Sequence, residues 1–212
     1  NDGLVSNVSL VMGMAGAATS DAAVLMAGLA GLVAGACSMA MGEWLSVNSS
    51  REFYQAQITE RAERLAVSPE DVRQRISSIY REKGLDPKEA DAMSARLGQT
   101  PRAILDTLVL EDLGVDPDEL GGSAWGASIS SFVLFAFGAF FPVAPYFWLH
   151  GTQAVIGSIC ATFLGLIVIA MGSALFTGRS IAFSIARQFM ITFAAAGVTW
   201  LVGYLIGAQV AA

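Results

Sequence analysis

Residues 22–45 read AAVLMAGLAGLVAGACSMAMGEWL, and this stretch decides the fold class. Its residues are apolar or small apart from Ser38 and Glu43. Because a helix rises about 1.5 Å per residue, roughly 20 such residues cross the hydrocarbon core of a bilayer. The stretch therefore predicts a membrane-spanning helix, with Met39 and Glu43 one turn apart near its end.

The composition of the chain also indicates a membrane protein. Of 212 residues, 54% are hydrophobic and only 14% are charged, and the mean hydropathy is +0.58. That balance is too apolar for an ordinary soluble domain. The net charge of −6 argues against nucleic acid as a partner. Cys37 and Cys160 lie in separate apolar runs and do not indicate a disulfide framework.

Charged residues gather in one part of the chain. Of 18 acidic residues, 15 lie within 52–119, and of 12 basic residues, 10 lie within 51–102. We therefore expect a soluble insert at 48–122 between two membrane parts at 1–47 and 123–212. Five stretches are candidate transmembrane helices: 3–18, 22–45, 125–143, 152–176 and 188–208. The predicted fold is an all-α integral membrane protein with five transmembrane helices, the insert following the second.

Basic residues set the expected orientation, because Lys and Arg stay on the cytoplasmic side of a membrane. Arg51 follows the second span, and Arg179 and Arg187 flank the link between the fourth and the fifth. The links at 19–21 and 142–151 hold no Lys or Arg. We therefore expect the insert in the cytoplasm and the C-terminus outside.

The insert is expected to hold three or four helices. Residues 48–65 contain no Gly or Pro, so the second membrane helix should continue through them as one rod. Three short helices should follow, because a capping residue before Pro is typical of a helix start. These starts are Ser68-Pro69, Asp86-Pro87 and Thr100-Pro101.

One acidic residue opens the first apolar stretch. Asp2 is followed by Ser6, Asn7 and Ser9, and residues three or four apart share a helix face. An ionised group at membrane depth is costly and usually functional, and oxygen ligands suit a divalent cation. We expect Asp2 to bind metal, with Ser6 and Asn7 lining the pathway. The alternative is that Asp2 only caps the helix at the membrane boundary.

Met39 and Glu43 share a face of the second span, about 6 Å apart along its axis. A thioether favours softer transition metals over Ca²⁺ or Mg²⁺, so the pair suits Fe²⁺, Mn²⁺, Co²⁺ or Zn²⁺ in passage. The alternative is that Glu43 lies at the cytoplasmic edge beside Trp44, which would anchor the helix at the interface.

Four carboxylates of the insert are candidate ligands for Fe²⁺: Glu60, Glu63, Glu111 and Asp112. Carboxylates on facing helices hold iron in other helical proteins. The alternative is a solvated charged surface, since Arg61 and Arg64 interleave with the glutamates. Neither a zinc-protease motif, nor a nucleophile elbow, nor a P-loop occurs in the sequence. We therefore expect neither catalysis nor an organic cofactor.

Glycine is abundant, with 22 residues. Gly31 and Gly35, and likewise Gly203 and Gly207, are four residues apart, a spacing that lets membrane helices approach closely. The sequence leaves open whether these faces pack inside one chain or across a dimer.

Four segments carry a family resemblance. NDGLVSNVSLVMG opens the chain, AGLAGLVAGACSMAMGEWLSVNSSREFY covers the second span, and FVLFAFGAFFPVAPYFW and TGRS follow the insert. In this order they resemble the vacuolar iron transporter family, as a bacterial member, over almost the whole chain. The resemblance implies a homodimer in the bacterial inner membrane that exports Fe²⁺, and often Mn²⁺, from the cytosol with protons as the counter-ion. It also implies that Asp2 and Met39 are translocation ligands.

The chain departs from the family pattern at several positions. Plant members carry a Glu where this chain has Gly31. The family's insert gathers metal with a second Glu pair, a Met pair and a last Glu, which fall here on Val72, Arg75, Leu108, Val109 and Asp112. Some bacterial relatives carry a ferritin-like domain before the first span. The opening NDGLVSN has no Met, and we expect such a domain to precede Asn1.

Two functions follow from these observations. The first is a homodimeric exporter of Fe²⁺, with Mn²⁺ as a further substrate, in which metal passes Asp2, Met39 and Glu43 while protons move inward. The alternative is a non-transporting membrane scaffold whose insert docks a partner. Gly31 and the altered insert favour this alternative.

Overall fold

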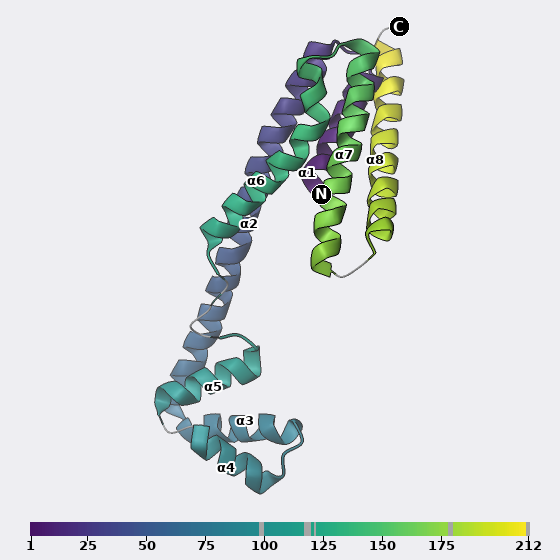
Figure 1. Ribbon diagram of the computed structural model, residues 1–212. Helices are drawn as coiled ribbons and strands as arrows, with labels where there is room; N and C mark the ends of the chain where they lie inside the picture. Colours follow the sequence, from purple (N-terminus) through teal and green to yellow (C-terminus); the bar gives the residue numbers. More distant parts are fainter. Residues whose placement is uncertain (98–99, 117–119, 121, 178–179, 211–212) are drawn as a thin grey trace. The chain divides into compact units, whose positions relative to one another are not determined.

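The computed structural model describes residues 1–97, 100–116, 120, 122–177 and 180–210 (Figure 1). Within these residues the chain is helical and has no strand, which confirms the all-α prediction. The helices are α1 (Asp2–Gly16), α2 (Asp21–Val67), α3 (Pro69–Glu82), α4 (Pro87–Leu97), α5 (Pro101–Leu113), α6 (Ala124–Val143), the 3₁₀ helix η1 (Ala144–Phe147), α7 (Gly151–Thr177) and α8 (Ile181–Val210).

Four helices of the described chain are long and apolar enough to cross a membrane. They are α2, α6 continued by η1, α7 and α8. α1 has 15 residues, fewer than the roughly 20 that a crossing takes. The five-span count therefore stays a prediction, as does the orientation. Arg179, one of the residues used for the orientation, lies outside the described residues.

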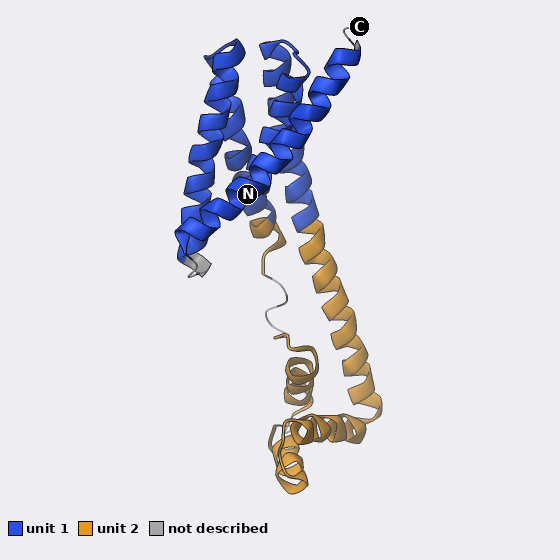
Figure 2. Ribbon diagram, turned by 90° about the vertical axis from the view of Figure 1, so that its right-hand side faces the viewer, with its two compact units in different colours: residues 1–43, 128–212 blue, residues 44–127 orange. Residues whose placement is uncertain are grey.

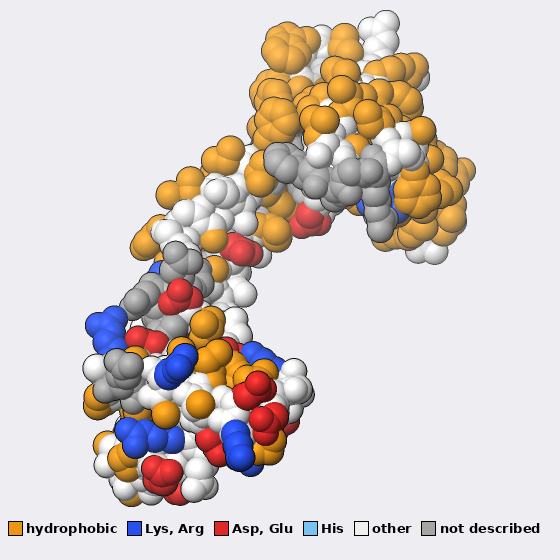
Figure 3. All heavy atoms as spheres, turned by 60° about the horizontal axis from the view of Figure 1, so that its bottom comes forward, with side chains coloured by type: hydrophobic (Ala, Val, Ile, Leu, Met, Phe, Trp, Pro, Cys, Tyr) orange, Lys and Arg blue, Asp and Glu red, His pale blue; other side chains and the backbone are white. Residues whose placement is uncertain are grey.

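The chain divides into two compact units (Figure 2). Unit 1 consists of residues 1–43 and 128–212, and unit 2 of residues 44–127. In Figure 3, hydrophobic side chains cover most of the visible surface of unit 1, whereas acidic and basic side chains gather on unit 2. Leu134, Leu164 and Leu201 are among the many large hydrophobic side chains that unit 1 exposes. An exposed apolar surface of this extent is typical of a membrane protein.

α1 supplies much of the core of unit 1. Its apolar residues belong to a buried cluster shared with α2, α6, η1 and α7: Val8, Val11, Met12, Val24, Val143, Tyr146 and Ala154. α8 packs against α1 backbone to backbone, since a Cβ on Gly203 would collide with the carbonyl oxygen of Gly13. The small-residue face of α8 is thus used inside the chain.

Unit 2 has a core of its own. It is formed by one residue at the end of α2 and others from α3 and α5: Leu65, Val72, Ile76, Ile79, Ile104 and Leu108. Ile76 and Ile79, and likewise Ile104 and Leu108, lie three or four residues apart and so share a helix face.

The predicted caps of the short helices differ in their chemistry. Thr100 Oγ1 accepts a hydrogen bond from the backbone amide of Ala103, at 3.2 Å. Asp86 Oδ1 accepts one from the backbone amide of Lys88, at 3.1 Å. Ser68 occupies the N-cap position of α3 and Pro69 begins the helix, as predicted, but the Ser68 side chain makes no capping hydrogen bond. Ser68 is the single residue between α2 and α3, and its own amide still donates to the carbonyl of Arg64. Ser68 is therefore both the turn between the two helices and the N-cap of α3.

Candidate metal site

Unit 1 contains a cavity of about 280 Å³ where α1, α2 and α6 meet. Its walls combine polar and apolar side chains: Asp2, Ser6, Asn7, Leu10, Gly31, Gly35, Ser38, Met39 and Phe135. Asp2, Ser6 and Asn7 come from α1, and Met39 comes from α2. The structure thus brings together four of the residues that the sequence singled out.

Asp2 is the acidic residue of this cavity. It lies in the first turn of α1, after the N-cap residue Asn1, where the helix dipole favours a negative charge. Ser6 Oγ donates a hydrogen bond to Asp2 Oδ1, at 2.9 Å. Ser9, on the same face in the sequence, donates to the carbonyl of Val5 instead and does not line the cavity. One oxygen of Asp2 is therefore oriented by a neighbour, and the side chain remains exposed.

Asn7 connects three helices. Its side-chain nitrogen donates to the carbonyl oxygen of Gly28 in α2, at 3.1 Å, and to that of Ala139 in α6, at 2.7 Å. The side chain is buried, at 2% exposure. Its oxygen has no hydrogen-bond partner among the described residues. Asn7 thus holds the helices that form the cavity.

Met39 and Glu43 differ in their relation to the cavity. Met39 lines it, and 39% of the side chain is exposed. Glu43, one turn further along α2, is not a lining residue. The pair that looked like one site in the sequence is therefore divided between the cavity and the part of α2 beyond it.

The cavity offers one carboxylate, one amide oxygen, hydroxyl groups and one thioether sulfur. Among the described residues, no group of three or more His, Cys, Asp or Glu side chains could hold a metal ion. A site in this cavity would therefore carry one negative charge per chain. Such a mixed oxygen and sulfur set suits a divalent transition metal that binds in passage, rather than one held permanently.

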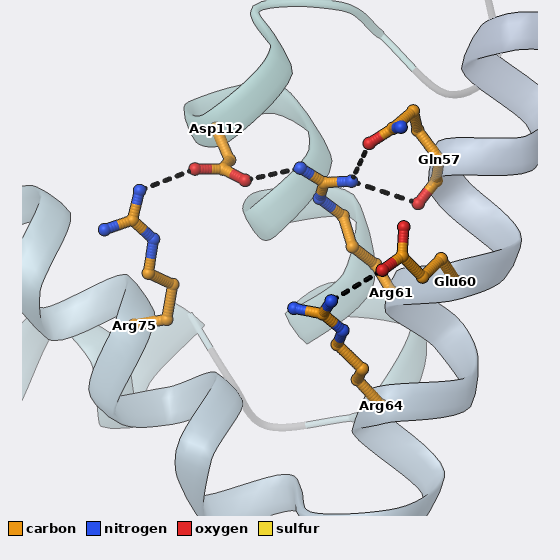
Figure 4. A network of polar contacts seen from close by, with 6 residues as sticks. All are labelled: Gln57, Glu60, Arg61, Arg64, Arg75 and Asp112. Atoms are coloured by element: carbon orange, nitrogen blue, oxygen red, sulfur yellow. Dashed lines mark hydrogen bonds and ion pairs between the residues drawn. The ribbon is translucent and has the colours of Figure 1, made fainter.

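In unit 2, Asp112 lies between two arginines (Figure 4). Its carboxylate oxygens lie 2.6 Å from Arg61 Nη2 and 2.8 Å from Arg75 Nη2. These two hydrogen bonds lower the pKa of Asp112 below its usual range, and the bond from Arg61 has the larger effect. Asp112 in turn raises the pKa of Arg75. The three side chains join α2, α3 and α5.

Two of the other acidic candidates of unit 2, Glu60 and Glu111, also have basic partners. Glu60 forms an ion pair with Arg64, at 2.5 Å. Glu111 accepts hydrogen bonds from Lys83 and from the Tyr80 hydroxyl. Both bonds lower the pKa of Glu111, and the bond from Lys83 has the larger effect. The pKa of Tyr80 is raised to about 12, mainly by burial and next by the hydrogen bond to Glu111.

Glu60, Glu63 and Asp112 line one cleft of about 830 Å³, together with Arg61, Arg64 and Arg75. Glu111 is not among its lining residues. The four predicted ligands of the insert are thus not gathered into one cluster within the described residues. Metal binding by them stays a prediction.

Comparison with known proteins identifies the family. A family model described as the VIT family matches residues 1–204. The chain belongs to the VIT family. This confirms the resemblance found in the sequence. With its four membrane-length helices, this VIT family member is an integral membrane protein.

Several VIT family proteins are similar to this chain over most of its length. Vacuolar iron transporter 1 of Arabidopsis thaliana is 30% identical over 182 residues, 84% of this chain and 71% of the relative. Vacuolar iron transporter 1 of Tulipa gesneriana is 29% identical over 181 residues, covering 85% and 73%. Vacuolar iron transporter of Acanthamoeba castellanii is 30% identical over 192 residues, covering 89% and 72%.

Only part of this site could be predicted from the sequence. It indicated Asn7 as a polar lining residue, but not its two bonds to other helices. Ser38 and Phe135 were missed altogether. Gly31, Gly35 and Ser38 lie four and three residues apart on α2, so they share the face that leads to Met39. That small-residue face was the available signal for the wall of a cavity.

Proposed function

We propose that this chain is a transporter of divalent iron, Fe²⁺, that also accepts Mn²⁺. The observation that carries the proposal is the cavity of unit 1, in whose wall Asp2 and Met39 lie together. The names of its relatives, which are called vacuolar iron transporters, support iron as the substrate. Both metals accept the same oxygen and sulfur ligands.

Each lining residue would make a different contribution to metal binding. The Asp2 carboxylate supplies the negative charge that compensates part of the charge of the cation. Met39 supplies a soft ligand that favours a transition metal over Mg²⁺ or Ca²⁺. Ser6 orients one oxygen of Asp2, which leaves the other free for the metal. We place Glu43 at the cytoplasmic entrance, one turn before Met39 for an ion moving outward.

We propose export from the cytoplasm by proton antiport. A carboxylate at membrane depth can bind either the metal or a proton, and not both at once, which couples the two movements. In this scheme metal enters from the side of the insert, displaces a proton from Asp2 and leaves on the opposite side. A proton then returns inward to Asp2.

We further propose that the transporter is a homodimer. One ionised carboxylate per cavity leaves a divalent cation half neutralised, and a net charge at membrane depth is costly. Two copies that turn this open cavity toward each other would supply two Asp2 carboxylates and two Met39 sulfurs. The exposure of Asp2 and Met39 in the single chain supports this arrangement.

Metal uptake into proteoliposomes tests the function. We expect Asp2→Asn to abolish uptake of Fe²⁺ and Mn²⁺, because the charge is lost at constant shape. Met39→Leu should slow uptake, whereas Met41→Leu should leave it unchanged, since Met41 is exposed and lies outside the cavity. Unchanged uptake in both Asp2→Asn and Met39→Leu would defeat the assignment.

A second candidate function is a membrane scaffold whose unit 2 docks a partner. The pairing of Asp112 and Glu111 with basic side chains favours it, because such carboxylates hold helices together rather than bind metal. A scaffold would transport no metal in the same vesicles. Within the transporter, we propose for Glu60 and Glu63 only a weak collecting role.

A further inference from the structure

Asn7 is the buried polar residue in the wall of the candidate metal cavity. At 2% exposure it contrasts with Asp2, Ser6 and Ser38, which are all exposed. Both bonds of its side-chain nitrogen go to backbone carbonyls, those of Gly28 and Ala139. The side-chain amide therefore has two fixed donor contacts before any ligand arrives.

These contacts also fix which end of the amide faces the cavity. A rotation of the amide by 180° would bring its oxygen against two carbonyl oxygens and lose two hydrogen bonds. The nitrogen must therefore stay between Gly28 and Ala139, and the oxygen must stay on the other side. The orientation follows from the hydrogen-bond pattern alone.

The oxygen faces the space at Gly31. A Cβ on residue 31 would lie 2.8 Å from Asn7 Oδ1 and 2.5 Å from Leu10 Cδ2. Gly31, Asn7 and Leu10 all line the cavity. No side chain from position 31 stands between the amide oxygen and the cavity, although the oxygen itself is buried and the Leu10 side chain lies beside it.

The buried side-chain oxygen of Asn7 is available to a ligand, because it accepts no hydrogen bond from the described residues. A buried acceptor without a hydrogen bond is unfavourable, and Asn7 Oδ1 has no partner among the described residues. The same cavity holds the Asp2 carboxylate and the Met39 sulfur. Amide oxygens are good neutral ligands for hard and borderline divalent cations.

We propose that Asn7 Oδ1 is a direct ligand of the transported divalent cation, which would reach it on the side where Gly31 brings no side chain. This inference rests on the proposed function, because it needs a metal in the cavity. It adds a neutral ligand beside the single charge of Asp2. An aspartate could not replace Asn7, because it would place a second oxygen against the carbonyls of Gly28 and Ala139.

Infrared spectroscopy of an isotope-labelled amide tests the proposal directly. The chain has three asparagines, Asn1, Asn7 and Asn48. In a full-length variant with Asn1→Ser and Asn48→Ser, asparagine labelled with ¹³C at the side-chain carbonyl reports on Asn7 alone. We expect Mn²⁺ to move this carbonyl band to lower frequency, and the shift to be absent when Asp2→Asn is added.

Two glycines of α2 provide a matched pair of variants. Gly31→Ala puts a methyl group in front of Asn7 Oδ1, whereas Gly42→Ala adds the same group with nothing within 4 Å. We expect Gly31→Ala to weaken Mn²⁺ binding about tenfold, the equivalent of one lost ligand contact, and Gly42→Ala to leave it unchanged.

The outcomes separate this inference from the proposed function. Asp2-dependent Mn²⁺ binding with an unmoved Asn7 band, or with equal affinity in Gly31→Ala and Gly42→Ala, would overturn the role of Asn7 and leave the transporter intact. Mn²⁺ binding that does not depend on Asp2 would overturn both. A band that moves with Mn²⁺ only when Asp2 is present supports both.

Discussion

The side-chain oxygen of Asn7 lies 2.8 Å from the position that a Cβ atom on residue 31 would take. At this point α1 brings an unpaired oxygen and α2 brings no side chain. Plant members of the family are expected to carry a Glu at this position, where this chain has Gly31. In the proposed site, the neighbouring helix supplies a neutral oxygen atom to this space.

The close approach of α1 and α2 predicts a steric effect on stability. The methyl group of Gly31→Ala would lie 2.5 Å from Leu10 Cδ2 and 2.8 Å from Asn7 Oδ1. Such overpacking costs about 1–3 kcal/mol. We expect a lower Tm in detergent, followed by tryptophan fluorescence, and partial recovery when Leu10→Ala is added. A double variant no more stable than Gly31→Ala would contradict this packing.

Asp112 is expected to stabilise unit 2. Asp112→Asn removes the charge that holds Arg61 and Arg75, and a hydrogen bond to a charged group contributes about 1.5–3 kcal/mol. We therefore expect faster hydrogen exchange of the α3 and α5 amides in the full-length protein. Asp106→Asn is the matched control, because Asp106 pairs with Arg102 over 3.6 Å on an exposed surface and such pairs contribute little.

The same contact predicts a dependence on pH. The pKa of Asp112 is lowered in the folded protein, mainly by the hydrogen bond from Arg61. The stabilisation is therefore complete above the unfolded pKa of about 3.9 and is lost as pH falls through the lower folded value. Exchange protection of α3 and α5 should fall at acidic pH in the wild type, and fall less in Asp112→Asn. Equal loss in the two proteins would assign the acid sensitivity to other groups.

Glu111 should control the ionisation of Tyr80. Burial is the largest cause that raises the pKa of Tyr80 to about 12, and the hydrogen bond with Glu111 is the next. Glu111→Gln should therefore lower this pKa only part of the way to the ordinary value. A rapid pH jump with absorbance at 295 nm, corrected with Tyr80→Phe, measures it. An unchanged pKa in Glu111→Gln would mean that the Tyr80–Glu111 bond does not form in solution.

The acidic residues of unit 2 are expected to contribute little to metal affinity. Glu60 already pairs with Arg64, and Asp112 with two arginines. Since exposed carboxylates bind cations only weakly, Glu60→Gln with Glu63→Gln should change the Mn²⁺ affinity by less than about twofold. Titration calorimetry on the full-length protein checks this. A large loss of affinity would make the insert a metal store after all.

The sequence predicts the helices better than the site. Pro69, Pro87 and Pro101 begin α3, α4 and α5, because Pro after a capping residue favours a helix start regardless of what packs around it. The partners of Asp112 depend on how α2, α3 and α5 pack, and spacing along one helix says nothing about that.

The cavity shows the same limit. Asp2 and Met39 could each be recognised in the sequence as candidate metal ligands, because each stands out within its own helix. Asn7 acquires its role only from the carbonyls of Gly28 and Ala139, which are far away in the sequence. Backbone carbonyls carry no side-chain signal, so a bond to them cannot be inferred before the fold is known.

The central claim is that metal and protons move in opposite directions past Asp2. The most direct test is proton flux, followed with a pH-sensitive dye inside sealed proteoliposomes, when Fe²⁺ or Mn²⁺ is added to one side. The account predicts metal-dependent proton movement against the metal in the wild type and none in Asp2→Asn. Metal uptake without proton movement would contradict antiport, and the absence of both in the wild type would contradict transport itself.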